Sequence, residues 1–220
     1  MIYNVPVQDV QCDEIWGFAQ KKEGHKWPWE SGATNIGDAH CFVAIERTNK
    51  LVLAWHLGRR TDADTQRFTE KLRVATSGWF QITTDGFQPY RKAVPKSLGV
   101  RTDFAQLVKV YATSKEGERR YSPPDVTAAV PQVIHGDPDP DRICTSHVER
   151  QNLTIRMSMR RMTRLTNAFS KKWENLKAAY ALHFAYYNFC RFHQSLKKQT
   201  PAMASGLTDH KWTLAELLAA

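Results

Sequence analysis

The chain has 220 residues, of which 42% are hydrophobic and 24% charged, and this composition fits one globular domain with a substantial core or one domain with a helical extension. Its formal net charge of +9 favours an anionic partner, either nucleic acid or a membrane surface. We expect no membrane-spanning helix and no signal peptide, because the apolar residues 178–190 form a short, interrupted stretch and residues 1–10 lack a basic start followed by an apolar run.

The beginning of the chain predicts three antiparallel strands. We expect them over residues 7–19, 41–46 and 51–57, where β-favouring residues are frequent. Residues 21–38 are polar and contain several glycines and a proline, which indicates a turn region.

A helix is expected after Thr61, which is a suitable N-cap and is followed by acids in the first turn. A fourth strand is expected over residues 80–84, a short helix over 89–94 and a fifth strand over 105–110. Three aromatic residues of the predicted strands, Trp16, Trp55 and Phe80, are expected in the core rather than as platforms for stacking bases.

Residues 114–141 are rich in proline and turn-forming residues, so an irregular insertion is expected there. From about Thr145 the pattern is helical for a long way, Pro201 ends a segment, and residues 210–220 favour a last short helix. We expect one domain over residues 1–200 and a tail over 201–220. The order of elements matches a ribonuclease H-like α/β fold: a mixed five-stranded sheet flanked by helices, with a basic helical C-terminal region.

The basic surplus is concentrated late in the chain. Between Arg142 and Thr200 there are twelve Lys and Arg residues and only two acids, Glu149 and Glu174, whereas the remainder is nearly neutral. A charge run is commonly a solvated helix face, but so strong a local imbalance favours nucleic acid as the partner of this stretch.

The cysteines are widely spaced and form no CxxC pair. A structural zinc site is therefore not expected, and nothing in the pattern requires disulfides. We expect a reducing, cytoplasmic location.

Two adjacent acids interrupt the first predicted strand. A carboxylate among apolar strand residues needs a reason, and side-chain alternation places Asp13 and Glu14 on opposite faces. One of the two can be an ordinary solvent-facing acid. We favour Asp13 as the functional residue, although spacing alone does not decide between them.

Two further acids occupy positions where sites are common. Asp85 ends the fourth strand, although Asp-Gly is also ordinary turn chemistry. Glu149 lies near the start of the basic helix, where capping by Thr145 or Ser146 would also account for an acid. In the expected fold the first and fourth strands are neighbours and the helix packs across them, so Asp13, Asp85 and Glu149 would converge. All-oxygen ligands of this kind suit Mg²⁺ or Mn²⁺.

Four motifs follow one another along the chain: Gln11-Cys12-Asp13-Glu14-Ile15-Trp16, Thr83-Thr84-Asp85-Gly86, Thr145-Ser146-His147-Val148-Glu149-Arg150-Gln151-Asn152, and Tyr187-Asn188-Phe189-Cys190-Arg191-Phe192-His193 with Thr200-Pro201-Ala202 after it. With them the chain resembles the DDE transposases of bacterial insertion sequences, most closely the insertion-sequence-one type. The resemblance covers nearly the whole chain.

The resemblance implies two-metal catalysis with Asp13, Asp85 and Glu149 as the catalytic and metal-binding residues, using Mg²⁺ with Mn²⁺ as a substitute. It implies cleavage of DNA at the transposon ends and attack of the freed 3′-hydroxyl on target DNA. It also implies a homo-oligomer that assembles on DNA, at the bacterial nucleoid. Such transposases usually carry an N-terminal zinc-binding or helix-turn-helix region, and none is expected before the strand that starts at Val7.

Two other functions remain open. A ribonuclease H-like nuclease or resolvase would cut DNA without strand transfer, which the motifs over residues 187–201 argue against. A DNA-binding regulator or domesticated remnant would not cut at all, which the intact acidic triad argues against.

At about 100° per residue, Glu149, Arg156 and Arg160 share one face of a continuous helix. We expect this arginine row to lay the DNA backbone across the metal site, with Arg164 displaced to one side. The competing interpretation is that these arginines are solvated or pair with acids such as Asp137, Asp139 and Asp141. The residues expected to contact DNA are Arg150, Asn152, Arg156, Arg160, Arg161, Arg164, Lys171 and Lys172.

Overall fold

The protein contains a six-stranded sheet in the order β4-β3-β2-β6-β7-β8. The structure is a computed structural model and describes residues 2–112, 126–164 and 166–219. The strands of the sheet are β2 (Asp9–Ala19), β3 (Gly37–Glu46), β4 (Val52–Gly58), β6 (Phe80–Asp85), β7 (Thr102–Tyr111) and β8 (Val126–His135). A small parallel pair joins β1 (Val5–Pro6) to β5 (Thr76–Ser77).

Strand β2 lies in the middle of the sheet and has neighbours of both directions. It pairs antiparallel with β3, which pairs antiparallel with β4. On its other side β2 runs parallel to β6, and β6 runs parallel to β7. The predicted meander and the predicted pairing of the first and fourth strands are both confirmed. The predicted number of five strands is wrong, because β8 adds an antiparallel sixth strand beside β7.

Strand β8 lies within the segment that the sequence predicts as an irregular insertion. Its Pro131 is opposite Leu107 of β7. A proline is compatible with an edge strand, because the N–H that it lacks is not needed on the open side. Most of β8 is exposed, so no apolar alternation marks it as a strand. The earlier part of the predicted insertion, residues 114–125, lies outside the described residues.

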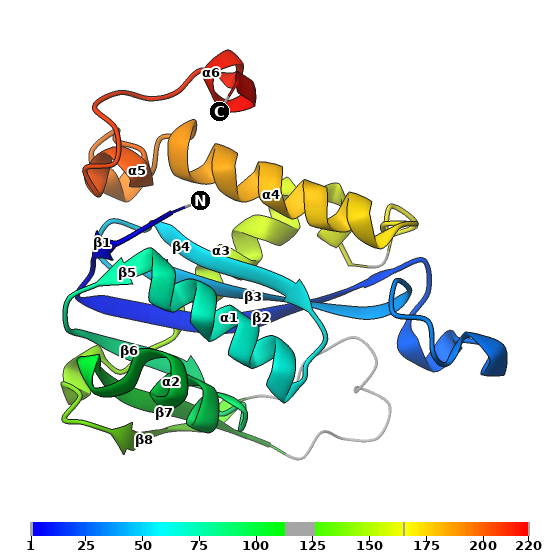
Figure 1. Cartoon of the computed structure of the whole chain (residues 1–220), viewed down its shortest axis with the longest axis horizontal. Helices are drawn as coiled ribbons and strands as arrows, with labels where there is room; N and C mark the ends of the chain where they lie inside the picture. The colour runs from blue at the N-terminus through cyan, green and yellow to red at the C-terminus, as the bar shows by residue number, and fades with distance from the viewer. Residues whose placement is uncertain (1, 113–125, 165, 220) are drawn as a thin grey trace.

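Helices cover both faces of the sheet (Figure 1). One face carries α1 (Asp62–Ala75) and α2 (Tyr90–Leu98), and the other carries α3 (Ser146–Ser158) and α4 (Trp173–Phe189). Helix α1 begins as predicted, since the side chain of Thr61 accepts a hydrogen bond from the Asp64 N–H at 3.2 Å.

Each face of the sheet has its own apolar core. Val10 and Cys12 of β2 belong to the core under α1 and α2, whereas Ile15 of the same strand belongs to the core under α3 and α4. Because β2 is covered on both sides, every position along its middle is at least half-buried. Any polar side chain there therefore lies between layers rather than in solvent.

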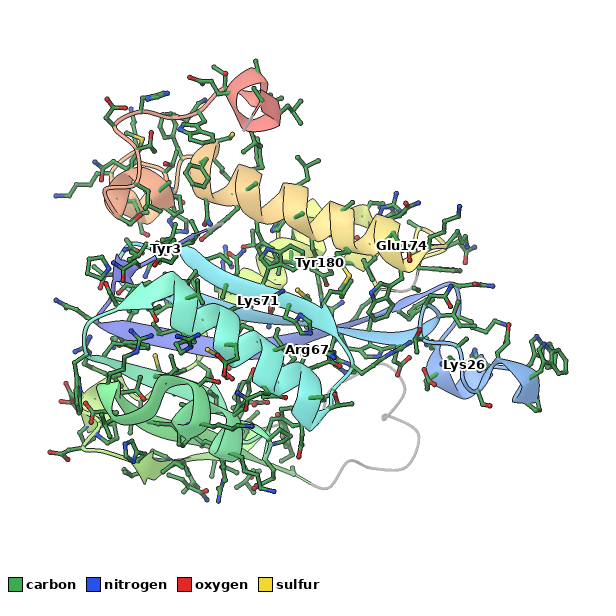
Figure 2. All side chains as sticks on the ribbon, viewed as in Figure 1. Tyr3, Lys26, Arg67, Lys71, Glu174 and Tyr180 are labelled. Atoms are coloured by element: carbon green, nitrogen blue, oxygen red, sulfur yellow. The ribbon has the colours of Figure 1, made fainter. Side chains whose placement is uncertain are left out.

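The predicted aromatic core residues differ in burial. Phe80 is fully buried in the first core. Trp55 is half-buried against the second core, 6.2 Å from the ring of Tyr180, which Figure 2 places between α4 and the sheet. Trp16 is half-buried and lies outside both cores, where it lines a cavity together with Arg156. The core prediction is therefore confirmed for Phe80 and holds only in part for the two tryptophans.

The long helix predicted from Thr145 is interrupted. Helix α3 ends at Ser158, the backbone of Met159 is extended, and α4 begins only at Trp173. Short helical turns occur here and elsewhere: η1 (Glu23–His25), η2 (Pro28–Glu30), η3 (Gly99–Arg101), η5 (Pro140–Arg142), η6 (Arg160–Met162) and η7 (Gln194–Leu196).

A tertiary contact accounts for the interruption. The side chain of Met162 packs on Gly17 of β2 so closely that a Cβ at Gly17 would lie 3.0 Å from its sulfur. The same sulfur accepts a hydrogen bond from the Tyr180 hydroxyl at 3.1 Å. Met162 is therefore buried between β2 and α4, and a straight continuation of α3 would not put it there.

The chain ends in two short helices, α5 (Pro201–Ala204) and α6 (Leu214–Ala219). Pro201 begins α5, and Thr200 caps this helix by accepting from the Met203 N–H at 3.1 Å. Helix α6 lies within the predicted last helix. None of the helices in the described part of the chain is both long and apolar enough to cross a membrane.

Candidate metal centre

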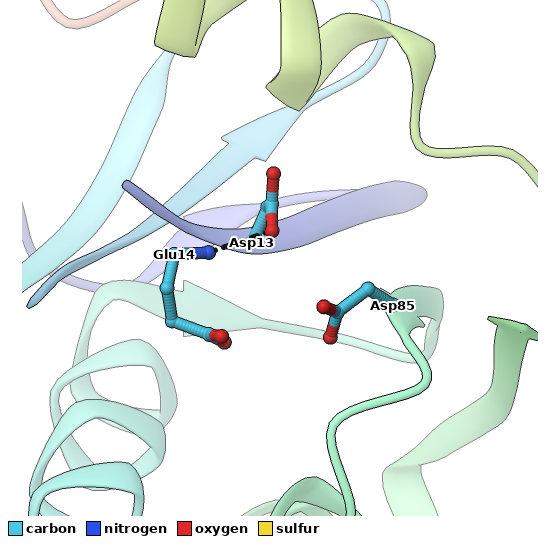
Figure 3. Close-up of side chains that lie close together, drawn as sticks. All are labelled: Asp13, Glu14 and Asp85. Atoms are coloured by element: carbon cyan, nitrogen blue, oxygen red, sulfur yellow. Dashed lines mark hydrogen bonds between the residues drawn. The ribbon is translucent and has the colours of Figure 1, made fainter. Parts of the chain in front are cut away.

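The parallel pairing of β2 and β6 brings acidic residues together near the middle of the sheet. The register aligns Cys12 with Thr84, so Asp13 and Asp85 follow as the next residues of their strands. Carboxylate oxygens of Asp13, Glu14 and Asp85 all lie within 4.8 Å of one another (Figure 3). We call these three residues the acidic cluster.

The two acids of β2 reach Asp85 from opposite faces of the sheet, as strand alternation requires. Asp13 Oδ2 accepts a hydrogen bond from Asn152 Nδ2 of α3 at 2.8 Å. Glu14 Oε2 accepts from Arg60 Nε, near the start of α1, at 3.2 Å. Asp85 ends β6, so its side chain is free to lie between the two faces.

Glu14, which the sequence pattern left as the less favoured of the two adjacent acids, lies in the acidic cluster together with Asp13. Its side chain is only 2% exposed, and its buried Oε1 has no hydrogen-bond partner among the residues that the structure describes. Neither acid of β2 is an ordinary solvent-facing acid, because helices cover both faces of this strand. The available signal was the presence of apolar residues at both even and odd positions of the strand, such as Cys12 and Ile15, which is typical of a strand buried on both sides.

Burial and mutual repulsion raise the pKa values of the cluster. Burial, followed by the charge of Asp85, raises the pKa of Asp13 to about 7 and that of Glu14 to about 8. Burial also raises the pKa of Asp85, although its hydrogen bond from the Phe87 N–H at 3.0 Å opposes the shift. The protein thus holds three carboxyl groups where their ionised forms are disfavoured.

One arginine partly compensates the cluster. Arg60 pairs with Glu14 and places Nη2 3.7 Å from Asp85 Oδ2. Its guanidinium carbon lies 4.1 Å from the centre of the Phe87 ring, which fixes the side chain over an aromatic face. The charge of Lys109 also lowers the pKa values of Asp13 and Asp85, but this lysine is paired with Glu149, so the cluster can accommodate more positive charge.

Glu149, the third predicted ligand, lies beside the acidic cluster but is not part of it. It precedes Asn152 by one turn of α3, and its charge raises the pKa of Asp13, after larger contributions from burial and Asp85. In this structure its Oε1 pairs with Lys109 Nζ of β7 and accepts a hydrogen bond from Thr145 Oγ1 at 2.5 Å. Glu149 therefore faces the cluster while a lysine holds its carboxylate.

The donor set fits a divalent cation. It offers carboxylate oxygens only, which suit Mg²⁺ and Mn²⁺. Glu14 Oε1 is a buried acceptor without a hydrogen bond of normal geometry among the described residues, although the Tyr90 hydroxyl is close enough to lower the pKa of Glu14, and a cation would satisfy this oxygen. A cation would also relieve the repulsion that raises the pKa values of Asp13 and Glu14.

The predicted arginine row does not form as a row. Arg156 lies on the face of α3 that carries Glu149, but its guanidinium donates to the backbone oxygens of Met162 at 3.0 Å and Trp16 at 3.1 Å. Arg160 lies beyond the end of α3, in η6. The expectation that Glu149, Arg156 and Arg160 share one helix face is therefore wrong for Arg160, because α3 ends first.

The other predicted DNA contacts lie in different surroundings. Asn152 binds Asp13, as described above. Arg161 donates to Ser170 Oγ at 3.3 Å, and Lys171 Nζ lies 3.4 Å from the centre of the Phe169 ring. The remaining three, Arg150, Arg164 and Lys172, are exposed.

Comparison of the chain with protein-family models and with curated proteins finds no match.

Proposed function

We propose that this chain is the catalytic domain of a DDE transposase, which cleaves DNA at the ends of an insertion sequence and transfers the cut strands to target DNA. The observation that carries the proposal is the meeting of Asp13 and Asp85 on adjacent parallel strands, under a helix that brings Glu149 beside them. The sheet supports a ribonuclease H-like fold, because an antiparallel meander is followed by two strands parallel to the first.

In this proposal Asp13, Asp85 and Glu149 hold two divalent cations. When bound, the cations activate the attacking water or 3′-hydroxyl and stabilise the leaving oxygen of the phosphodiester. The chain's own residues prepare the ligands: Asn152 orients Asp13 through its hydrogen bond, and the Phe87 N–H orients Asp85. In the structure Lys109 pairs with Glu149, so a bound cation would compete with this lysine for the carboxylate.

The first experiment measures whether the protein binds the metal and cuts DNA. The full chain is titrated with Mn²⁺ by calorimetry and then incubated with supercoiled plasmid and Mg²⁺ or Mn²⁺, with a chelator as the control. We expect saturable binding and metal-dependent nicking. A protein that binds DNA but neither binds Mn²⁺ nor nicks it would be a DNA-binding remnant, and the proposal would fail.

A second experiment separates a transposase from a nuclease. A labelled linear DNA with free 3′-hydroxyl ends is incubated with an unlabelled plasmid under the same conditions. Strand transfer joins the label covalently to the plasmid, and the joined product survives denaturing electrophoresis. Cleavage without any joined product would favour the nuclease or resolvase alternative.

The third carboxylate is tested by a matched pair of variants. Glu149→Gln and Glu14→Gln each replace one carboxyl group beside Asp13 and Asp85 by an amide with little change of shape. We expect Glu149→Gln to abolish nicking and weaken Mn²⁺ binding, and Glu14→Gln to retain most of both. The reverse result would make Glu14 the third ligand, in line with its place in the acidic cluster.

A further inference from the structure

A second polar site lies on the other side of α3. A cavity of about 230 Å³ is enclosed by α3, the turn that contains Lys50, and the segment that follows α4. Position 151 is two residues beyond Glu149, hence about 200° around the helix. The cavity and the acidic cluster therefore lie on opposite sides of α3.

The walls of this cavity are basic. No Asp or Glu of the described chain lines it, whereas five Lys, Arg and His side chains do: Lys50, His147, Arg150, Arg191 and His193. Neither Arg150 nor Arg191 pairs with a carboxylate within the described ranges. Arg191 and His193 come from the fourth sequence motif, which the catalytic proposal leaves without a role.

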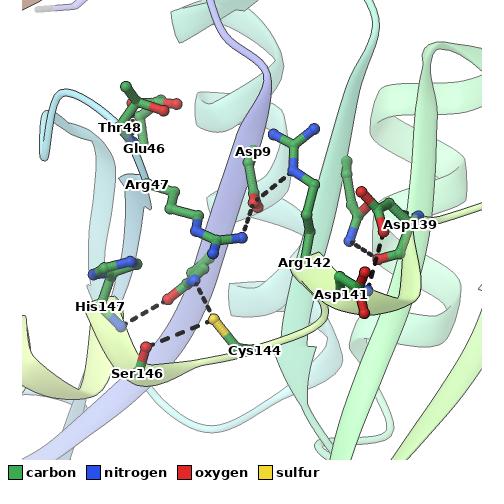
Figure 4. Close-up of polar contacts among 12 residues, drawn as sticks. Asp9, Glu46, Arg47, Thr48, Asp139, Asp141, Arg142, Cys144, Ser146 and His147 are labelled. Carbon is green, nitrogen blue, oxygen red and sulfur yellow. Dashed lines mark hydrogen bonds and ion pairs between the residues drawn. The ribbon is translucent and has the colours of Figure 1, made fainter.

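The nearest acids are already engaged (Figure 4). Asp9 Oδ2 pairs with Arg47 Nη1 at 3.1 Å and with Arg142 Nε at 3.3 Å. Glu46 Oε2 accepts the backbone N–H groups of the turn between β3 and β4, at 2.7 and 2.6 Å. No carboxylate of the described residues forms an ion pair with a cation of the cavity, although the charge of Glu46 acts on Lys50.

A buried donor also lacks a partner there. Gln151 lines the cavity and is only 2% exposed, and no atom of the described residues accepts a hydrogen bond from its Nε2. Buried donors of this kind nearly always have an acceptor, in the protein or in a ligand. Burial lowers the pKa of His193, and the charges of Lys50 and Arg191 lower it further, in keeping with surplus positive charge.

We propose that this cavity binds a phosphate group, between the two guanidinium groups and the Gln151 amide. Phosphate fits better than a carboxylate, because the guanidinium and amide N–H groups offer more hydrogen bonds than the two oxygens of a carboxylate can accept. One guanidinium group can also donate to two phosphate oxygens at once. The phosphate chemistry rests on the cavity alone. Its assignment to a backbone phosphate of bound DNA rests on the proposed function.

The first arm of the test uses inorganic phosphate and no divalent metal. Thermal unfolding of the full chain is measured in phosphate and in chloride at equal ionic strength, because a ligand of the folded state raises the melting temperature. The double variant Arg150→Ala/Arg191→Ala should lose this rise. The matched control Lys197→Ala/Lys198→Ala removes the same charge from exposed residues outside the cavity and should keep it.

A single substitution provides an independent test in case the double variant does not fold. Gln151→Glu places a carboxylate where the ligand oxygen would lie, so it should raise the melting temperature in chloride and abolish the response to phosphate. An equal response to phosphate in wild type, Arg150→Ala/Arg191→Ala and Gln151→Glu would overturn the proposal, as would no response in wild type.

The second arm uses a short duplex DNA and fluorescence anisotropy over a range of salt concentrations. Loss of one phosphate contact should weaken binding on the order of tenfold and reduce the slope of log K against log salt by about 0.9. If the cavity variants lose the phosphate response but bind DNA as wild type does, the ligand is a free phosphate and the DNA assignment is overturned. Failure of the nicking assay with an intact phosphate response would instead count against the proposed function.

Discussion

The two sides of α3 carry opposite surpluses of charged groups: acidic on one side and basic on the other. On one side three carboxyl groups lie close together beside Arg60, and burial, followed by the charges of neighbouring acids, raises their pKa values. On the other side five basic or imidazole side chains line a cavity without an acid among the described lining residues. Helix α3 therefore separates a surplus of acidic groups from a surplus of basic groups, which do not form ion pairs with one another.

This difference fits the two ligands proposed above, a divalent cation on one side of α3 and a phosphate group on the other. A protein selected for stability alone would pair such groups or replace them with apolar residues. Glu149 and Arg150 are adjacent in sequence and belong to the two different sides of α3. The helical periodicity therefore places adjacent residues of opposite charge on different sides of α3. Substitutions on one side can be tested separately from those on the other.

The largest expected effect comes from removing a carboxylate of the proposed metal centre. Asp13→Asn or Asp85→Asn should lower metal-dependent nicking about 1000-fold, since metal coordination accounts for several kcal/mol of transition-state stabilisation. Far-ultraviolet circular dichroism should be unchanged, because each variant removes repulsion rather than packing. Asp62→Asn, at an exposed position of α1, is the control. Nicking at wild-type rate by both variants would exclude the metal centre.

The pH dependence of stability should reveal the strain of the acidic cluster in metal-free protein. The folded-state pKa of Glu14, about 8, lies above its ordinary value of 4.5, so the folded protein keeps a proton that the unfolded chain releases in this window. The contribution of Glu14 to stability is therefore fully present below the lower value and is lost as the pH rises toward the upper one, by about 5 kcal/mol. Urea unfolding at several pH values measures this fall.

The variant Glu14→Gln sharpens that measurement, because it removes one titrating group and keeps the side-chain shape. Its stability should fall less between the two pH values than that of wild type. If both proteins show the same pH profile, Glu14 is not the source of the strain.

A smaller effect is expected for the arginine that turned out to bind the backbone. Arg156→Ala should lower the free energy of unfolding by about 2 kcal/mol, because two carbonyl groups lose hydrogen bonds from a charged donor. Arg160→Ala, outside α3 and exposed, should change it by less than about 0.5 kcal/mol. Equal urea midpoints for the two variants would contradict the structural role of Arg156.

The smallest predicted effect concerns Lys109, which pairs with Glu149 in the absence of metal. Lys109→Met removes a competing cation, so Mn²⁺ should bind up to about tenfold more tightly, equivalent to 1.4 kcal/mol. Calorimetry measures the affinity, with Lys92→Met on α2 as the control for loss of one charge. Weaker Mn²⁺ binding by Lys109→Met would mean that the lysine holds Glu149 in a productive place.

Local sequence patterns were sufficient to predict most strands of the sheet and the start of α1. The meander, the fourth and fifth strands and the Thr61 cap depend on alternation, turns and capping within a few residues, and these are properties of the sequence itself. The position of Asp85 at a strand end beside Asp13 followed from the expected strand order. The same patterns could not reveal β8, because an exposed edge strand that contains Pro131 has no apolar alternation.

Tertiary contacts determined the end of α3, the burial of Glu14 and the formation of the basic cavity. Helix α3 ends where the burial of Met162 against Gly17 and Tyr180 stabilises a change of direction, and no local breaker marks that point. Glu14 became part of the acidic cluster because helices cover both faces of β2, so a residue on the far face is buried as well. The basic cavity brings Arg150 of α3 together with Arg191, which follows the end of α4. Sequence spacing determines which face of an element a side chain occupies, whereas packing determines what lies opposite that face.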